Sequence, residues 1–361
     1  MQERPLFVFS GQSNMMGACA LEPTIDFVST NSFEYKHKPK RLGEKSGSFV
    51  LVNKNVGEFS YIDLRQAYPN KTLNQLSDLV NYEENTFFCS AMCNADCISK
   101  KTVKPFSEYS EQTAKSGASL PYYFVREWEK LGKRCSYTHI AKGGVSIRHF
   151  FDNTMIDDVN KMIRSHNLSK NTALPLQPYT TELECRASNY FCEKISDFFI
   201  DAKKTYFNED TSFRPFVWLQ GETDSGEMDC DVYKCYLQVL DSTVKKLGCT
   251  HFLCIRVGFW ANTDGKEIMR AQEEFCNETP NAYIITRACS MMPYHNVDES
   301  ECYLSPPEEE YRNCRDSFFG FNNQHINEKG FLLIAKRLTE NIVRLQNNTP
   351  IILENDIVKY K

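Results

Sequence analysis

Strand-like and helix-like segments alternate along this sequence from about residue 119 onward, after one isolated strand pattern near its beginning. Runs of aliphatic and aromatic residues predict strands at Leu6–Ser10, Ser136–Ala141, Phe213–Leu219, Phe252–Phe259 and Ala282–Thr286. Apolar residues at helical spacing predict helices at Leu120–Leu131, Thr180–Phe207, Val232–Leu247, Lys266–Cys276 and Phe331–Leu345. Because alternating strands and helices form parallel sheets covered on both faces, we predict an α/β fold with a doubly wound, mostly parallel five-stranded sheet flanked by helices.

The segment from about residue 20 to residue 115 interrupts this alternation. It has no strong hydrophobic periodicity and is rich in Asn, Lys, Ser and Glu. Because a structureless loop of this length is rare in a compact domain, we interpret it as an irregular insertion that packs over the C-terminal end of the first strand. Residues 1–361 are therefore expected to form a single domain with one insertion.

The composition argues against several classes of function. The chain has 42 Lys and Arg residues against 47 Asp and Glu residues and no basic block, so we expect no nucleic-acid partner. Its apolar runs are far shorter than the ~20 residues that cross a bilayer, so we expect no membrane partner. The N-terminal segment lacks the apolar core of a signal peptide, which favours a cytoplasmic protein. The 15 cysteines are scattered and odd in number, as expected for free thiols in a reducing compartment.

Four short segments that follow predicted strands or precede the last predicted helix could carry chemistry. They are Gly11–Met15, Lys142–Ile147, Trp218–Ser225 and Asn322–Gly330. In a doubly wound sheet, ligands and catalytic groups collect at the C-terminal ends of the strands. Each segment also has a plainer interpretation: a helix N-cap serine, a glycine turn, a solvated acidic loop and a structural histidine.

The residue types in these segments suit acyl transfer. This chemistry needs an activated oxygen, a base with a pKa near neutrality, and hydrogen-bond donors aimed at a developing oxyanion. Ser13 lies in a predicted tight turn after the first strand, and paired glycines follow the second. Gln220 and two carboxylates follow the third, and His325 can reach the serine if the sheet is doubly wound.

Together the segments resemble the SGNH hydrolases, and within them the branch of sialate O-acetylesterases and acetyl-xylan esterases (the SASA-type carbohydrate esterases). The first segment contains the complete Gly-Gln-Ser-Asn-Met motif of that branch. The second contains its Gly-Gly and Ser-Ile pairs with Val145 between them, and the third matches Trp-x-Gln-Gly-Glu-x-Asp. The fourth matches the histidine and glycine of the last motif. The resemblance spans residues 11 to 330 and implies a flavodoxin-like, three-layer SGNH sandwich.

The resemblance also implies roles for individual residues. Ser13 would be the nucleophile, and His325 the general base and then the general acid. The backbone N–H groups of Ser13 and Gly144 and the side-chain amide of Gln220 would form the oxyanion hole. Gln12, Asn14, Arg148 and Asp224 are expected to contact substrate. No metal or other cofactor is implied.

Asn322 departs from the motif, which has an aspartate three residues before the histidine. An amide can orient the imidazole but cannot stabilise the imidazolium as a carboxylate does. Glu222 could supply the missing acid, or a Ser–His dyad could be steered by a backbone carbonyl. A third alternative is that activity is weak or lost.

The sequence therefore favours a carbohydrate O-acetylesterase, a serine ester hydrolase that works through an acetyl-serine intermediate on a small acetylated sugar. The sugar could be a sialic acid, whose carboxylate Arg148 could pair with, or a xylo-oligosaccharide; Arg148 could equally be a plain surface residue. The alternative class is a catalytically impaired, sugar-binding pseudo-esterase, which Asn322 motivates. A metal site at Cys89, Cys93 and Cys97 is disfavoured, because their spacing is not that of zinc ribbons.

Overall fold

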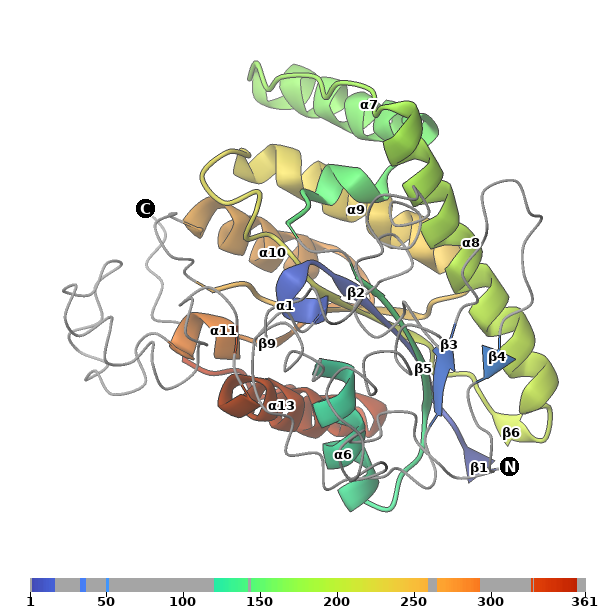
Figure 1. Cartoon of the computed structure of the whole chain (residues 1–361). Coiled ribbons are helices and arrows are strands. Elements are labelled where there is room, and N and C mark those ends of the chain that lie inside the picture. Colours follow the sequence, from blue (N-terminus) through green and yellow to red (C-terminus); the bar gives the residue numbers. More distant parts are fainter. Residues whose placement is uncertain are drawn as a thin grey trace, which may run out of the picture.

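One sheet between two layers of helices forms the body of the molecule (Figure 1). It is seen here in a computed structural model, which describes residues 2–16, 33–36, 50–51, 120–141, 144–258, 265–292, 326 and 328–355. Among these residues, the sheet has seven strands in the spatial order β4-β3-β5-β2-β7-β8-β9.

Five parallel strands form the body of the sheet: β2 (Leu6–Gly11), β5 (Ser136–Ala141), β7 (Pro215–Leu219), β8 (His251–Ile255) and β9 (Ala282–Thr286). Every neighbouring pair in this group runs parallel. The predicted five-stranded parallel sheet is thereby confirmed. Numbered along the chain, these strands lie in the order 2-1-3-4-5 of the flavodoxin-like doubly wound folds.

The predicted insertion contributes two short strands to one edge of this sheet. β3 (Phe33–Lys36) pairs in parallel with β5, and β4 (Val50–Leu51) pairs antiparallel with β3. The rest of the insertion lies outside the described residues. A separate two-stranded sheet joins β1 (Gln2–Glu3) to β6 (Glu209–Asp210).

The helices divide between the two faces of the sheet. On one face, α6 (Leu120–Lys130) packs against α13 (Glu328–Gln346) (Figure 1). On the other face, α9 (Cys230–Lys246) packs against α10 (Lys266–Glu278), and α8 (Glu182–Thr205) covers β2 and β5. The shorter helices are α1 (Ser13–Met16), the 3-10 helix η2 (Ile147–Phe150) and α11 (Ala288–Met291).

A further helix, α7 (Asn153–Lys170), was not predicted from the sequence. It packs on the outer side of α9, at the top of Figure 1. Asp152 caps its first turn by accepting a hydrogen bond from the Met155 N–H at 2.8 Å. Asn171 ends it in the left-handed conformation, with φ of 53°.

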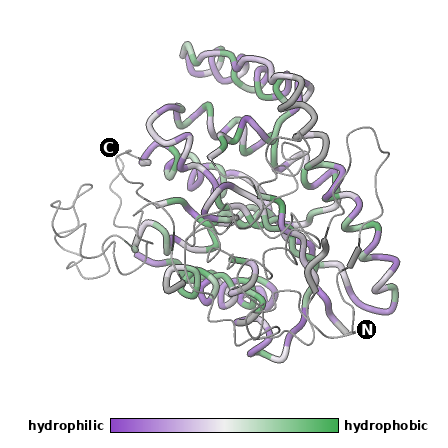
Figure 2. Tube along the Cα trace, viewed as in Figure 1, coloured by the Kyte–Doolittle hydropathy of each residue, from purple (hydrophilic) through white to green (hydrophobic). Residues whose placement is uncertain are grey.

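Aromatic side chains fix β2 within the core. Phe7 packs edge-on against Phe124 with ring centroids 4.7 Å apart, and Phe124 stacks on Trp128 at 5.5 Å. All six residues of β2 are buried, as expected for a central strand covered on both faces. Figure 2 shows hydrophobic segments along the sheet and hydrophilic ones along the outer sides of the helices. The turn that leads from β2 to Ser13 is therefore attached to a fully buried central strand.

β8 is shorter than predicted, because it ends at Ile255 rather than at residue 259. Beyond its end, the Arg256 guanidinium is buried in a salt bridge of 2.7 Å to Glu273 on α10. The next N–H, that of Val257, donates to the Gln272 side chain at 3.0 Å rather than to a neighbouring strand. An apolar sequence run thus continues past the point where strand pairing ceases.

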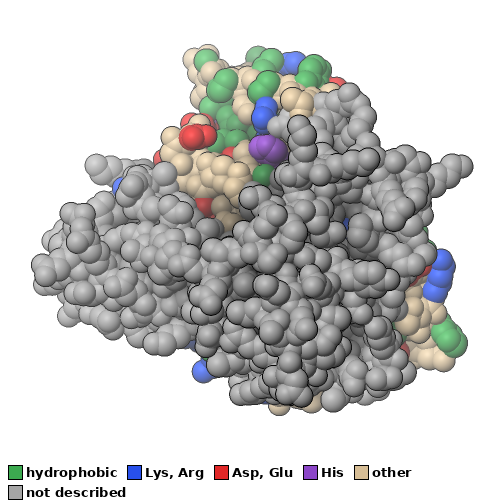
Figure 3. Space-filling view, in the orientation of Figure 1, with side chains coloured by type: hydrophobic (Ala, Val, Ile, Leu, Met, Phe, Trp, Pro, Cys, Tyr) green, Lys and Arg blue, Asp and Glu red, His purple; other side chains and the backbone are tan. Residues whose placement is uncertain are grey.

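None of the described helices is both long enough and apolar enough to cross a membrane. In the view of Figure 3, hydrophobic, basic and acidic side chains lie side by side on the upper part of the molecule, where Figure 1 shows α7.

Candidate active site

Three of the four sequence motifs meet at one edge of the sheet. β5, β2 and β7 are neighbours and run parallel, so the segments that follow them leave the sheet on the same side. These segments are 12–16 after β2, 144–147 after β5 and 220–225 after β7. The reversal of strand order lies beside β2, and ligands of doubly wound folds bind outside such a reversal.

Ser13 is the first residue of α1, directly after the turn at Gly11 and Gln12 that we call the serine turn, and it is nearly buried, with 7% exposure. The turn depends on Gly11, whose φ is +154°. A Cβ atom at Gly11 would lie 1.9 Å from the Leu219 carbonyl oxygen, so no other residue fits there. The same carbonyl accepts the Gln12 N–H at 3.1 Å, which ties the serine turn to the end of β7.

Gln220 is fully buried, and protein groups surround its side-chain amide. Its Nε2 donates to Asp224 Oδ2 at 2.6 Å and lies 3.1 Å from the Val145 carbonyl and 3.2 Å from Gln12 Oε1. Its Oε1 accepts from the Tyr233 hydroxyl at 2.8 Å, which fixes the orientation of the amide. The predicted oxyanion donor thus lies among all three motif segments.

Asp224 joins the segment after β7 to the segment after β5. Besides the Gln220 amide, its Oδ2 accepts the Ile147 N–H at 2.9 Å. The side chain is 3% exposed. Burial raises the pKa of this carboxyl group, while its hydrogen bonds with Gln220, Ser146 and the Ile147 N–H act in the opposite direction. These contacts lie within the protein and hold the 144–147 segment in place.

Glu222 and Asn14 form a second buried pair. Asn14 Nδ2 donates to Glu222 Oε1 at 2.8 Å, and Asn14 Oδ1 accepts the Ile326 N–H at 3.0 Å. Burial raises the pKa of the Glu222 carboxyl group, and the bond from Asn14 partly offsets this effect. Glu222 Oε2 is buried and has no hydrogen-bond partner among the described residues. Ile326 is the chain neighbour of His325, so Glu222 is linked through one side chain to the segment of the predicted base.

Arg148 and His149 lie in η2, next to the 144–147 segment, and both are half-buried. Ser146 caps this short helix by accepting the Arg148 N–H at 3.3 Å, and its carbonyl lies 3.3 Å from His149 Nδ1. Gly144 has φ of +66° and is exposed. It follows β5, the strand that pairs with β2. Of the residues in this segment, only Arg148 was expected to contact substrate, and this role stays a prediction.

Several predicted residues lie outside the described part of the chain. They are His325, Asn322, Gly143 and the three cysteines Cys89, Cys93 and Cys97. The arrangement of Ser13, Gly144, Gln220, Glu222, Asp224, Gln12 and Asn14 follows the predicted grouping at one sheet edge. Of these, Gln12, Asn14 and Asp224 were expected to contact substrate, and the structure gives each of them hydrogen bonds within the protein.

Sequence reasoning missed Tyr233 and Gln272. Both donate to Gln220, the tyrosine hydroxyl to its carbonyl at 3.0 Å and the Gln272 amide to the same carbonyl at 2.9 Å. They belong to α9 and α10, at positions that helical periodicity marks simply as core. No local signal identifies them, because the contact is made between distant chain segments.

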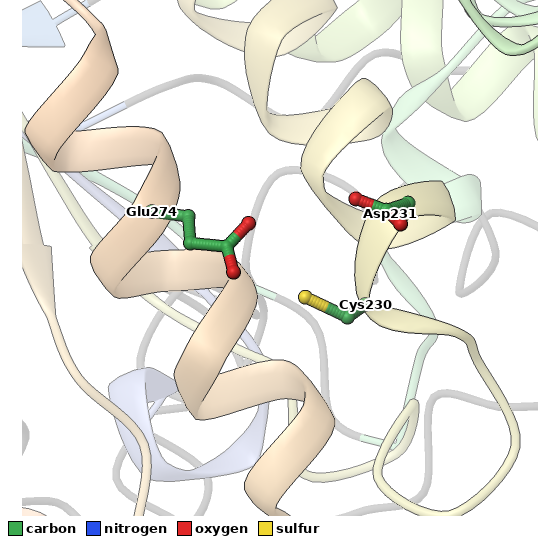
Figure 4. Close-up of side chains that lie close together, drawn as sticks. All are labelled: Cys230, Asp231 and Glu274. Atoms are coloured by element: carbon green, nitrogen blue, oxygen red, sulfur yellow. The ribbon is translucent and has the colours of Figure 1, made fainter. Parts of the chain in front are cut away.

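A group of metal-ligating side chains lies elsewhere, between α9 and α10 (Figure 4). Ligand atoms of Cys230, Asp231 and Glu274 are within 4.8 Å of one another, beside a cleft of about 900 Å³. However, Arg270 Nε donates to Cys230 Sγ at 3.1 Å and Lys234 Nζ to Glu274 Oε2 at 2.8 Å. Burial raises the pKa of the Cys230 thiol to about 11. A metal ion needs a thiolate and uncompensated carboxylates, so these residues do not fit one.

Comparison with known proteins gives matches among solved structures. No protein-family model matches the sequence, and no curated protein matches it. A protein from Arabidopsis thaliana is 12% identical with a TM-score of 0.43, over 96% of this chain and 99% of that one. NanS is 10% identical with a TM-score of 0.42, over 96% of this chain and 99% of that one. A carbohydrate acetylesterase from Xanthomonas citri is 11% identical with a TM-score of 0.37, over 77% of this chain and 48% of that one.

Proposed function

We propose that this protein is a serine esterase that removes acetyl groups from sugars, with Ser13 as its nucleophile. The observation that carries the proposal is the position of Ser13 after the C-terminal end of β2, beside the reversal of strand order, where its chain neighbours Gln12 and Asn14 contact the segment after β7. The motif resemblance supplies the reaction class, because fold alone does not define function.

The reaction begins when Ser13 Oγ attacks the acetyl carbonyl carbon and His325 takes the hydroxyl proton. The tetrahedral oxyanion is stabilised by the N–H groups of Ser13 and Gly144 and by the Gln220 amide. The C–O bond to the sugar then breaks, and His325 returns the proton to the departing sugar hydroxyl. Water, activated by the same histidine, hydrolyses the acetyl-serine to acetate and free serine.

The Gln220 side chain can donate to the oxyanion because its amide group carries two hydrogens. Its shortest bond goes to Asp224 at 2.6 Å, and the contacts to the Val145 carbonyl and Gln12 Oε1 are longer, at 3.1 and 3.2 Å. One hydrogen is held by Asp224, and the other, whose contacts to Val145 and Gln12 are longer, is the one available to the oxyanion. Loss of one such donor typically slows an acyl transfer by about 10²–10³-fold.

For the substrate we favour an O-acetylated sialic acid over an acetylated xylo-oligosaccharide. Arg148 lies half-buried beside the 144–147 segment, where a guanidinium group can pair with a carboxylate. Sialic acids carry such a carboxylate, and xylo-oligosaccharides do not. If the assignment is right, Arg148→Gln raises KM for the acetylated sialic acid and leaves KM for an acetylated xylobiose unchanged.

The proposal is tested by labelling and turnover. A fluorophosphonate should label wild type with one equivalent at Ser13, and Ser13→Ala should take up none. Turnover of p-nitrophenyl acetate should fall by about 10³-fold or more in Ser13→Ala. Ser169→Ala, which alters an exposed serine of α7, is the matched control and should behave as wild type.

A sugar-binding protein without catalysis is the second candidate function, and Asn322 favours it. A wild type that takes up no label and turns over no faster than Ser13→Ala, yet binds acetylated sugars, would establish this candidate and contradict the esterase.

A further inference from the structure

We propose that Asn14 is a positioning residue, which holds the peptide unit between His325 and Ile326 against the Glu222 side chain. The inference rests on the proposed function, because it assigns the way in which the segment of the base is kept beside the segment of the nucleophile. It gives Asn14 a different role from the substrate contact that its motif position suggests.

The geometry of Asn14 carries the proposal. Asn14 follows Ser13 directly in α1 and is 1% exposed. Its Nδ2 donates to Glu222 Oε1 at 2.8 Å, and its Oδ1 accepts the Ile326 N–H at 3.0 Å. One buried amide therefore bridges two segments that lie 208 and 312 residues away along the chain.

The bond to Ile326 acts on His325 through the covalent chain. The Ile326 N–H belongs to the peptide unit whose carbonyl group is that of His325. A peptide unit is planar, so a hydrogen bond to its N–H orients the plane that contains the His325 Cα atom. The Ser13 and Asn14 Cα atoms are about 3.8 Å apart for the same covalent reason. Nucleophile and base segments are thus connected through a single side chain.

Glu222 determines which way the Asn14 amide faces. A carboxyl oxygen that carries no hydrogen, such as the Glu222 Oε1 that Asn14 contacts, only accepts hydrogen bonds, and a backbone N–H only donates them. A flipped Asn14 amide would direct its oxygen at the carboxylate and its NH2 group at the N–H, and both bonds would be lost. Glu222 therefore acts on the base segment by fixing Asn14, whatever other group the histidine itself contacts.

This arrangement predicts a loss of kcat rather than of substrate affinity when Asn14 is changed. A misplaced base lowers the rate of proton transfer at an unchanged binding surface, and displacements of about 1 Å can cost about 10²-fold. A residue that contacted substrate directly would instead raise KM when it is changed.

The experiment compares wild type with a single variant and with a double variant in which the two groups are exchanged. In Asn14→Asp, the acceptor for Ile326 is kept, but a second carboxyl group faces Glu222. In the combined Asn14→Asp/Glu222→Gln variant, amide and carboxylate exchange places. The amide at position 222 then donates to the carboxylate at position 14, which still accepts from Ile326, and the net charge equals that of wild type.

We expect Asn14→Asp to lower kcat for p-nitrophenyl acetate by about 10- to 100-fold, with KM nearly unchanged. The combined variant should recover about tenfold or more of that loss. A combined variant no more active than Asn14→Asp would overturn the proposal. So would an Asn14→Asp variant in which only KM rises.

A second readout does not depend on activity. Hydrogen exchange at the Ile326 amide should become about tenfold faster or more in Asn14→Ala, while the combined variant should protect this amide as wild type does. Unchanged exchange in Asn14→Ala would overturn the proposal. If wild type lacks Ser13-dependent turnover, the proposed function fails, and the exchange data still decide the role of Asn14.

Asn160 of α7 provides the matched control. It is also a buried asparagine whose amide bridges two groups, since it donates to the Gln177 carbonyl at 2.9 Å and accepts the Gln177 N–H at 2.7 Å. Asn160→Ala should lower the melting temperature without changing kcat or exchange at Ile326. If Asn14→Ala does not fold, the combined variant alone carries the exchange test.

Discussion

At the scale of single residues, Tyr233 illustrates how a side chain outside every motif can define the site. Its hydroxyl group donates to both the side-chain oxygen and the backbone carbonyl of Gln220, at 2.8 and 3.0 Å. The tyrosine is fully buried on α9. Because the side-chain bond fixes the amide orientation, Tyr233 determines that the NH2 group of Gln220 faces Asp224 and the serine turn.

We therefore expect Tyr233→Phe to reduce activity as well as stability. Leaving the Gln220 oxygen without its donor costs about 1–3 kcal/mol of stability, and kcat/KM should fall by about tenfold. Tyr236→Phe is the matched control on the same helix, because that hydroxyl bonds to Gln177 at 3.2 Å instead. Thermal unfolding and esterase kinetics on both variants provide the check. Equal activity in the two variants would exclude a role for Tyr233 in orienting Gln220.

The sequence predicts which residues gather at the site but not how they bond. The sequence places Ser13, Gln220, Glu222 and Asp224 after predicted parallel strands, whose C-terminal ends share one edge of the sheet, and their roles come from the motif resemblance. Their partners come from segments about 200 residues away, as in the Asn14–Glu222 bond, which spans 208 residues. No local pattern encodes such a contact, so substrate-facing and inward-facing polar residues look alike in the sequence.

At the scale of elements, hydrophobic periodicity was sufficient for the strands and helices of the parallel sheet. It failed for α7, although the signal was present: Asp152 is an N-cap residue, and buried Met155, Ile156, Val159 and Ile163 recur at helical spacing. The many polar residues between them obscured the pattern. The short strands β3 and β4 could not be predicted, because they depend on pairing with the sheet edge rather than on their own sequence.

The serine turn is the element whose backbone is most constrained. We expect Gly11→Ala to cost about 3 kcal/mol or more, because its Cβ atom would lie 1.9 Å from the Leu219 oxygen at a φ of +154°. Gly132→Ala is the control: its φ is +69°, but nothing lies within 4 Å, so only about 1 kcal/mol is expected. Urea denaturation measures both losses. Similar values for the two variants would contradict this account of the turn.

At the scale of the whole molecule, the arrangement of strands decides where the site forms. The crossover from β2 to β5 passes over the face that carries α6, and the crossover from β7 to β8 passes over the face that carries α9. The chain after β2 and the chain after β7 therefore lead to helices on opposite faces, and segments 12–16 and 220–225 contact each other where these paths part. This consequence follows from strand order alone, and it is the reason why a correct fold prediction also located the candidate site.

Stability of the whole molecule should depend on pH through its buried carboxyl groups. Burial raises the pKa of Glu222 above its usual value of 4.5, although the Asn14 bond opposes the shift. An acid with a raised folded-state pKa favours folding when it is protonated. The contribution of Glu222 to the free energy of unfolding is complete below about pH 4.5, where the group is also protonated in the unfolded chain. This contribution is lost as pH rises through the folded-state pKa.

Between about pH 5 and about pH 8, the free energy of unfolding of Glu222→Gln should therefore fall less than that of wild type. Urea unfolding at both pH values measures this difference. Glu340→Gln, which alters an exposed residue of α13, should keep the slope of wild type. Parallel slopes for wild type and Glu222→Gln would show that this carboxyl group does not carry the dependence.

The bond between Asn14 and Ile326 also has a consequence during synthesis of the protein. It joins residues 312 positions apart, and a ribosome adds about 5–20 residues per second. A newly made Asn14 therefore waits roughly 15–60 s before the ribosome even reaches its partner. During that interval the serine turn is already translated, yet it lacks the contact that completes its surroundings. A nascent chain should thus carry Ser13 without the proposed activity, which should appear only when translation has passed the last motif.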